Sequence, residues 1–313
     1  MATNTAWQEA LSKRFRKLLS GAPDGNPPWL DVIAGGDDRG LFVPTDAPWV
    51  VHRDFGTLVG GIRALLVQAL HPGSLAGVRD HSRYQADPLG RLAGTIRWLT
   101  VTTFAGQTAV AREASRVRRL HDRVNGEYAA SDSQTVPYSA HDESLLLWVH
   151  VAFMESFLVA HEMYTSTPIP AGDKVTGADN YIAQWGAAVG PLGLDKTPNS
   201  RAAVDAFIDD LLNRGVLAVS DDTMRIVEFI RRPPLPLLTR PIYRLFFHAA
   251  VLSLRPEFRT LLRLRTPPRW LVVPATRATL RLIRWAIGPE SPLEDGALNR
   301  LARIGAIPGV GLA

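Results

Sequence analysis

One apolar stretch, residues 144–164, constrains the fold of this chain most strongly. From Leu146 to His161, apolar side chains and two histidines recur at steps of three and four residues. Such steps place side chains along one face of a helix, so the stretch predicts a helix whose apolar face lies in the interior. An imidazole among Leu, Phe and Met is poorly solvated and stays neutral, the form that can donate a lone pair to a metal. His150 is therefore either a core histidine hydrogen-bonded to a neighbour or an axial ligand of a cofactor iron.

The same helical periodicity dominates the rest of the chain, and it predicts a single compact all-α domain. One strand-like piece, residues 41–44 with 49–51, is expected to form a short ribbon at most. The expected helices cover residues 5–20, 54–70, 88–103, 106–124, 139–164, 179–189, 201–214, 221–230, 240–253, 256–264 and 274–287.

Composition excludes several kinds of site. The chain has no cysteine, which rules out disulfides, thiolate zinc sites, iron–sulfur clusters, cysteine-ligated haem and covalently attached c-type haem. Any bound metal must therefore use nitrogen or oxygen ligands. No apolar run without charges reaches the roughly 18 residues that span a bilayer, and the first thirty residues do not read as a signal peptide. We therefore expect a cytoplasmic protein.

Arginines are concentrated in the C-terminal third, at steps of about three to four residues among Leu, Val and Trp. They are Arg255, Arg259, Arg263, Arg265, Arg269, Arg277, Arg281 and Arg284. A basic amphipathic surface of this kind is either a solvated helix face or a peripheral contact with anionic lipid. No nucleic-acid motif or aromatic stacking platform accompanies it, so DNA or RNA binding is not expected.

Four segments occur in a recognisable order: 71–84 (HPGSLAGVRDHSRY), 87–106, 116–126 (RVRRLHDRVNG) and 138–150 (YSAHDESLLLWVH). In this order and at these distances they resemble the MpaB-like oxygenase family. That domain is shared by fungal oxygenases bound to the endoplasmic reticulum and by bacterial latex-clearing dioxygenases. The resemblance covers residues 45–265. Residues 1–44 would then form an N-terminal helix and loop, and residues 266–313 a helical extension.

The resemblance implies a mainly helical fold with a pocket between helices for non-covalent haem b, and a histidine as the proximal iron ligand. His150 stands where the family has that histidine. The implied activity is that of a haem-dependent oxidoreductase or oxygenase acting on an apolar small molecule, with an electron donor as a possible partner. Latex-clearing proteins are described as using a distal lysine on the arginine-rich helix, and this chain has no lysine between residues 112 and 125. The resemblance therefore does not imply that this chain cleaves rubber.

Further pocket residues are expected on the arginine-rich helix. Arg116 and Arg119 share one side of it, and guanidinium groups bind carboxylates such as the haem propionates in a bidentate way. The alternative for these arginines is salt bridging to Glu113, Asp122 or Glu127.

Three more residues are candidates for the haem pocket, and the sequence leaves other roles open for them. His121 occupies the histidine position of the family motif, and it either faces the haem or caps a neighbouring loop. His71 and Arg83 are candidate pocket residues. His71 is equally well explained as a residue at the C-terminal end of a helix.

The expected substrate pocket is lined by Phe104, Leu147, Phe153 and Phe157. A catalytically silent protein that binds haem or another apolar ligand on the same scaffold is the alternative function, and the sequence does not separate the two.

Overall fold

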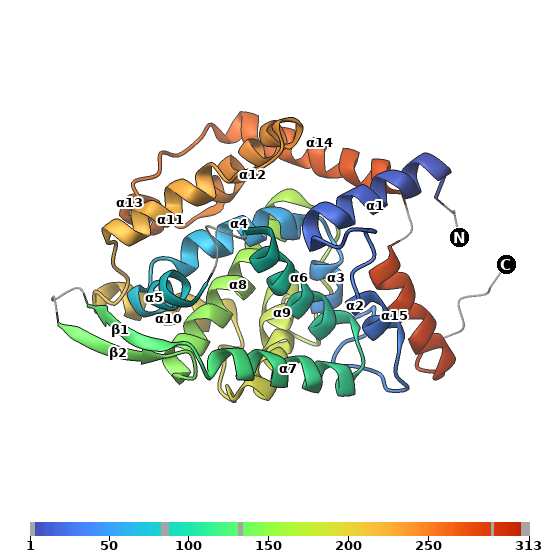
Figure 1. The fold of residues 1–313 in the computed structure, drawn as a ribbon, viewed down its shortest axis with the longest axis horizontal. Coiled ribbons are helices and arrows are strands. Elements are labelled where there is room, and N and C mark those ends of the chain that lie inside the picture. Colours follow the sequence, from blue (N-terminus) through green and yellow to red (C-terminus); the bar gives the residue numbers. More distant parts are fainter. Residues whose placement is uncertain (1–3, 83–87, 131–133, 289–290, 308–313) are drawn as a thin grey trace.

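The computed structural model describes residues 4–82, 88–130, 134–288 and 291–307. Helices dominate this part of the chain, together with one two-stranded antiparallel hairpin, so the predicted all-α class is confirmed (Figure 1). The helices are α1 (Ala6–Ser20), α2 (Trp29–Ala34), α3 (Ala47–His52), α4 (Gly56–Gln68), α5 (Pro72–His81), α6 (Pro88–Phe104), α7 (Gln107–His121), α8 (Glu143–Tyr164), α9 (Gly177–Trp185), α10 (Arg201–Asn213), α11 (Asp221–Arg231), α12 (Arg240–Ser253), α13 (Pro256–Leu261), α14 (Arg269–Ile287) and α15 (Pro292–Arg303). Short 3₁₀ turns are η1 (Gly186–Ala188), η2 (Gly190–Leu192) and η3 (Leu237–Thr239), and the strands are β1 (Asn125–Ala129) and β2 (Thr135–Ser139).

Helix α8 is the central element of the core. It packs along α4 over most of its length and also contacts α3, α5, α9, α12 and α14. Among the described helices it alone is long and apolar enough to cross a bilayer, but 67% of its most apolar window is buried inside the protein. That burial is what a core helix shows, because neighbouring helices take the place of solvent on nearly every side. The interior helix expected over residues 139–164 thus begins at Glu143 and ends at Tyr164.

Two further layers lie on either side of α8 in Figure 1. Helices α11, α12 and α14 form the upper layer together with α1, and α12 packs against both α14 and α4. Helix α7 and the β1–β2 hairpin lie on the opposite, lower side. Helix α6 crosses between these layers and contacts α1 as well as α7.

The close approach of α4 to α8 depends on Gly60. A methyl group added at Gly60 would lie 2.8 Å from Phe157 Cδ1 and 3.1 Å from both Phe157 Cα and the Ser156 carbonyl oxygen. Two of these three atoms belong to backbone, which cannot move away without separating the helices. Gly60 therefore sets the distance between the two central helices.

Gly60→Ala is expected to lower the free energy of unfolding by about 1–3 kcal/mol, because the added methyl overpacks this contact. Gly61→Ala is the matched control, since nothing lies within 4 Å of a methyl group at that position. There the same substitution should stabilise α4 by up to about 1 kcal/mol through helix propensity. Urea unfolding of both variants tests the pair, and equal effects would show that the two helices are not in close contact.

The prediction of a short β-ribbon at residues 41–44 and 49–51 is wrong. Residues 47–52 form helix α3, in which Trp49, Val50 and Val51 are all buried. A short apolar run that is buried on every side carries no periodicity, so strand and helix cannot be told apart from its pattern. The hairpin instead joins β1 to β2, with Asn125 opposite Ser139 and Ala129 opposite Thr135.

Besides α3, helices α2 and α5 lie outside the ranges predicted as helical. Helix α15 lies in the predicted C-terminal helical extension, and α14 begins five residues earlier than predicted. The sequence predicts a helix start at Pro274, but this residue lies inside α14, which begins at Arg269. A proline can occupy the second turn of a helix at the loss of one backbone hydrogen bond, so it does not have to mark the first residue.

Candidate functional site

His150 lies in the N-terminal half of α8 and is only 4% exposed. Its Nε2 atom is buried and has no hydrogen-bond partner within the described part of the chain. Burial lowers the pKa of the imidazole to about 4. A neutral ring at physiological pH therefore presents a buried nitrogen that the protein itself does not satisfy. Buried polar atoms usually have a partner, so an orphan of this kind calls for an explanation.

The two other histidines near this face of α8 are better satisfied. His52, on α3, contacts Thr103 Oγ1 through Nδ1 at 2.8 Å and the Tyr181 hydroxyl through Nε2 at 2.9 Å. His161 donates from Nε2 to the Thr167 carbonyl oxygen at 2.8 Å, which leaves its Nδ1 without a partner. The hydrogen bonds of His52 connect α3 to α6 and α9, and the hydrogen bond of His161 connects α8 to the loop that follows it. Both rings therefore have a structural role.

His150 shares its face of α8 with Phe153, Phe157 and His161, as the steps of three and four residues require. The Phe157 ring packs edge-on against His52 at 5.4 Å between ring centroids and is buried. Phe153, one turn nearer to His150, is only partly buried, and its ring lies 6.0 Å from that of Phe157. Phe153 is therefore a partly exposed residue between two buried ones, His150 and Phe157.

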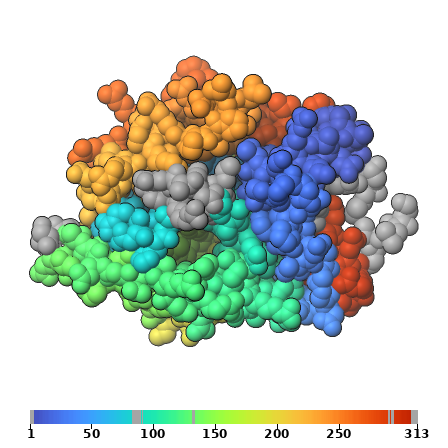
Figure 2. All heavy atoms as spheres, in the orientation of Figure 1, coloured from blue at the N-terminus to red at the C-terminus, as the bar shows by residue number. Residues whose placement is uncertain are grey.

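A second incompletely covered surface lies on α6. Every residue from 92 to 99 is partly exposed, although the helix crosses the middle of the molecule, whereas Thr100 to Phe104 are buried. Ile96 and Leu99 belong to this apolar, partly exposed half. The surface is hollowed between α5 on one side and α6 and α7 on the other (Figure 2). Phe104 lies beyond this uncovered half, buried against Trp49 at 4.9 Å between ring centroids. Leu147 on α8 is partly buried.

Glu113 of α7 is the centre of an ion-pair cluster that joins α7 to α6. Its carboxylate is 3% exposed and accepts hydrogen bonds from Arg97 Nε at 2.9 Å and from Arg116 Nε and Nη2 at 3.0 and 2.6 Å. Burial alone would raise the pKa of Glu113, but the hydrogen bonds from Arg116 and Arg97 outweigh it and hold that pKa below its ordinary value. Two guanidinium groups share one carboxylate, so one positive charge is left over. Both arginine side chains remain about one-third exposed.

The other predicted site residues of α7, Arg119 and His121, lie outside the Glu113 cluster. Arg119 is exposed on α7 and has no ion pair among the described residues. His121, at the last residue of α7, is partly buried, and its ring lies 6.0 Å from that of His141. Burial lowers the pKa of His121, and the neighbouring His141 lowers it further. His141 itself contacts Asp122 Oδ1 at 2.8 Å.

His71 does not lie on the His150 face of α8. It is the N-cap residue of α5, where its Nδ1 accepts a hydrogen bond from the Gly73 amide at 3.2 Å, and not the C-terminal residue of α4. Its ring lies 6.1 Å from that of Trp148. Trp148 and His150 are two residues apart, so their side chains leave α8 about 200° apart. Burial lowers the pKa of His71 to about 4. Arg83 lies outside the described residues.

Sequence reasoning named Glu113 only as an alternative salt-bridge partner and did not single out Arg97. The spacing of Glu113 and Arg116, three residues apart on one helix, was a usable signal. Nothing in the sequence shows that Arg97, on the preceding helix, reaches the same carboxylate, because that contact depends on how α6 packs on α7.

A protein-family model described as "ER-bound oxygenase mpaB/B'/Rubber oxygenase, catalytic domain" matches residues 49–285. The chain belongs to this family. The resemblance seen in the sequence is thereby confirmed, and this MpaB/rubber oxygenase domain includes α8, the Glu113 cluster and the helices α11 to α14. Comparison with curated proteins gave no match, and comparison with solved structures gave none either. The chain therefore carries an oxygenase catalytic domain, the domain of an oxidoreductase.

Proposed function

We propose that this MpaB/rubber oxygenase domain binds haem b through His150 and oxidises an apolar small molecule. The observation that carries the proposal is the orphaned Nε2 of His150, a neutral and buried nitrogen in an oxygenase catalytic domain. The chain has no cysteine, so a thiolate cannot ligate the iron, and imidazole nitrogen is a common axial ligand of haem. The residues present therefore fit the group. When bound, haem supplies the redox chemistry and the activation of dioxygen, which no protein side chain can provide.

The protein would contribute position and charge. Helix α8 is held on nearly all sides by other helices, so it presents the His150 ring from a rigid support. Burial keeps that ring neutral, which leaves its lone pair available to iron.

The Glu113 cluster would supply the counter-charge for the carboxylates of the group. Arg116 and Arg97 carry one positive charge more than Glu113 neutralises, and both remain partly exposed. Guanidinium groups are the usual partners of carboxylates in proteins. Arg119, exposed one turn further along α7, is a second candidate for this role.

The uncovered surfaces support an apolar substrate. The partly exposed apolar side chains of α6 and the partly buried Phe153 and Leu147 of α8 offer aliphatic and aromatic contacts and few polar groups. Such a lining favours an apolar substrate such as an isoprenoid or another hydrocarbon-like metabolite. An electron donor is the expected partner where the reaction consumes reducing equivalents.

His150→Ala is expected to abolish the Soret band that the wild-type protein develops when titrated with haemin. His248→Ala is the matched control, because that histidine is exposed on α12, whereas His150 is buried on α8. Added imidazole should restore part of the band in the His150 variant by taking the place of the missing ligand. An unchanged Soret band in His150→Ala would overturn the assignment. Haem binding without oxygen uptake on a panel of alkenes with a reductant would favour a non-catalytic haem-binding protein.

A further inference from the structure

Helix α14 presents an apolar stripe to solvent. Trp270 is 79% exposed and Trp285 64% exposed, and Leu271, Pro274, Ala278 and Leu282 are exposed between them. These positions fall within about 120° of one another around the helix axis. The opposite side of α14 is also apolar and buried, through Val272 and Leu280, so the outward stripe is not the face that packs on the core. A contiguous exposed apolar surface usually marks a contact with a membrane or another partner.

Helix α1 extends the stripe, and turn η3 carries two further exposed apolar side chains in the same layer. Trp7 and Leu11 of α1 are exposed, and the ring of Trp7 lies 5.4 Å from that of Trp285. Turn η3, which packs on α12, carries Leu237 at 73% and Leu238 at 93% exposure. The prolines at 233, 234 and 236 precede this turn and restrict its backbone. Leu238 is therefore held almost fully in solvent by a stiff segment, which no contact within the described protein explains.

The charge of this layer is strongly one-sided. Residues 231–288 contain twelve arginines, no lysine and one acidic residue, Glu257, whereas the rest of the chain carries 23 basic and 29 acidic residues. Seven of the exposed arginines have no carboxylate partner in the described part of the chain: Arg240, Arg244, Arg263, Arg265, Arg269, Arg277 and Arg281. The excess of positive charge thus lies in the same layer as the exposed tryptophans and leucines.

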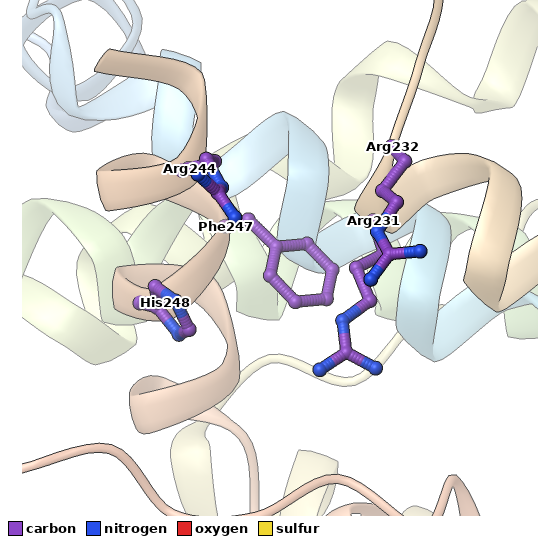
Figure 3. A pocket seen from close by; sticks show the side chains of 5 residues that line it. All are labelled: Arg231, Arg232, Arg244, Phe247 and His248. Carbon is purple, nitrogen blue, oxygen red and sulfur yellow. The ribbon is translucent and has the colours of Figure 1, made fainter. Parts of the chain in front are cut away.

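A small cleft of about 90 Å³ lies between the C-terminal end of α11 and α12 (Figure 3). Its lining is Arg231, Arg232, Arg244, Phe247 and His248, without an acidic residue. Burial, Arg231 and Arg244 all lower the pKa of His248. Arg231 and Arg232 pair with Glu228 at 3.9 and 3.1 Å, whereas Arg244 has no carboxylate partner in the described part of the chain. Guanidinium groups around a small cleft favour a phosphate-sized anion.

We propose that this surface, defined by the exposed residues of α1, η3, α12 and α14, docks the protein on the face of an anionic phospholipid membrane. Apolar side chains would enter the headgroup boundary, with Trp270 and Trp285 at the two ends of α14, as tryptophan does at membrane interfaces. The unpaired arginines would meet the lipid phosphates, and the α11–α12 cleft would take one headgroup phosphate. A protein partner would require acidic complementarity along the whole layer. Nucleic acid would leave the apolar stripe uncovered.

Vesicle flotation of the full-length protein tests the proposal. The protein is expected to float with vesicles that contain about one-third phosphatidylglycerol in phosphatidylcholine, and not with phosphatidylcholine alone. Raising the salt from about 0.1 M to about 1 M should release most of it, because screening weakens the phosphate contacts. Trp fluorescence should shift to shorter wavelength on binding, as the exposed indoles leave water.

Two pairs of variants locate the contact. Leu238→Asp with Leu282→Asp should weaken binding on the order of tenfold or more, because each places a charge at the acyl boundary. Leu120→Asp is the control, since Leu120 is 51% exposed, close to the 60% of Leu282, but lies on α7 at the far side of the molecule (Figure 1). Arg244→Glu with Arg281→Glu should also weaken binding, whereas Arg214→Glu on α10 should not.

Four results would overturn the proposal: no flotation with anionic vesicles, equal binding to neutral ones, equal losses in the controls, or a solution dimer that hides the stripe without vesicle binding. Tighter binding to a duplex oligonucleotide at the same salt concentration would also contradict it.

Discussion

Lowering the pH from about 8 to about 5 is expected to lower the free energy of unfolding by about 6 kcal/mol. Three buried histidines have strongly lowered pKa values in the folded protein. Burial lowers the pKa of His52 to about 3, helped by His161, and burial lowers those of His71 and His150 to about 4. In the unfolded chain each titrates near its ordinary pKa of 6.5. As the pH falls below 6.5, the unfolded chain therefore takes up protons that the folded protein does not, and each histidine costs about 2 kcal/mol by pH 5.

Urea unfolding at several pH values between 8 and 5 measures this slope. Most carboxylates titrate below this range, so they contribute little to it. His52→Gln should reduce the slope by up to about a third, since it removes one of the three histidines whose pKa is lowered to about 4 or below. A free energy of unfolding that stays constant between pH 6.5 and pH 5 would show that these imidazoles are not buried in the native protein.

Glu155→Gln is expected to lower the free energy of unfolding by about 3–5 kcal/mol, because it leaves a buried guanidinium without its counter-charge. Arg63 of α4 is fully buried and pairs with both carboxylate oxygens of Glu155 on α8, with Nη2 donating to Oε1 at 2.7 Å. It also donates to Ser156 Oγ at 2.7 Å and to the Ser253 carbonyl oxygen, at the end of α12, at 3.2 Å. One guanidinium thus joins three helices of the core.

The double variant Arg63→Met with Glu155→Leu is the matched control. It removes both charges and keeps the volume apolar, so it should be far less destabilising than Glu155→Gln alone. Chemical denaturation of the wild type, the single and the double variant gives the comparison. If the double variant lost as much stability as the single one, the geometry of the pair and not the isolated charge would be responsible.

Most helices could be predicted because their apolar residues repeat with the helical period. The stretch 144–164 is the clearest case, and α10, α11 and α12 were placed within one or two residues. The secondary-structure predictions fail where the local pattern of apolar residues does not distinguish a helix from a strand. Residues 49–51 are buried on all sides in α3, and the β1–β2 hairpin pairs two short segments, NGEYA and TVPYS, that contain few apolar residues. Pairing between strands is a tertiary contact, so it overrides weak local preference.

Some features of the candidate site could also be predicted from the sequence, and others could not. His150 could be singled out because an apolar helix surrounds it in the sequence. That its Nε2 lacks a partner could not be foreseen, since this depends on which side chains the neighbouring helices bring. Arg116 was predicted as either a carboxylate ligand or a salt-bridge partner of Glu113, and the structure contains the salt bridge. Arg97 joins the same carboxylate only because α6 packs on α7.

The shared carboxylate of Glu113 has a consequence for the order of assembly. Without Glu113, the guanidinium groups of Arg97 and Arg116 would repel each other. The packing of α6 on α7 would then need an external anion between them. Glu113 is part of the chain and already sits between them. The polypeptide can therefore form the junction of α6 and α7 without an external anion.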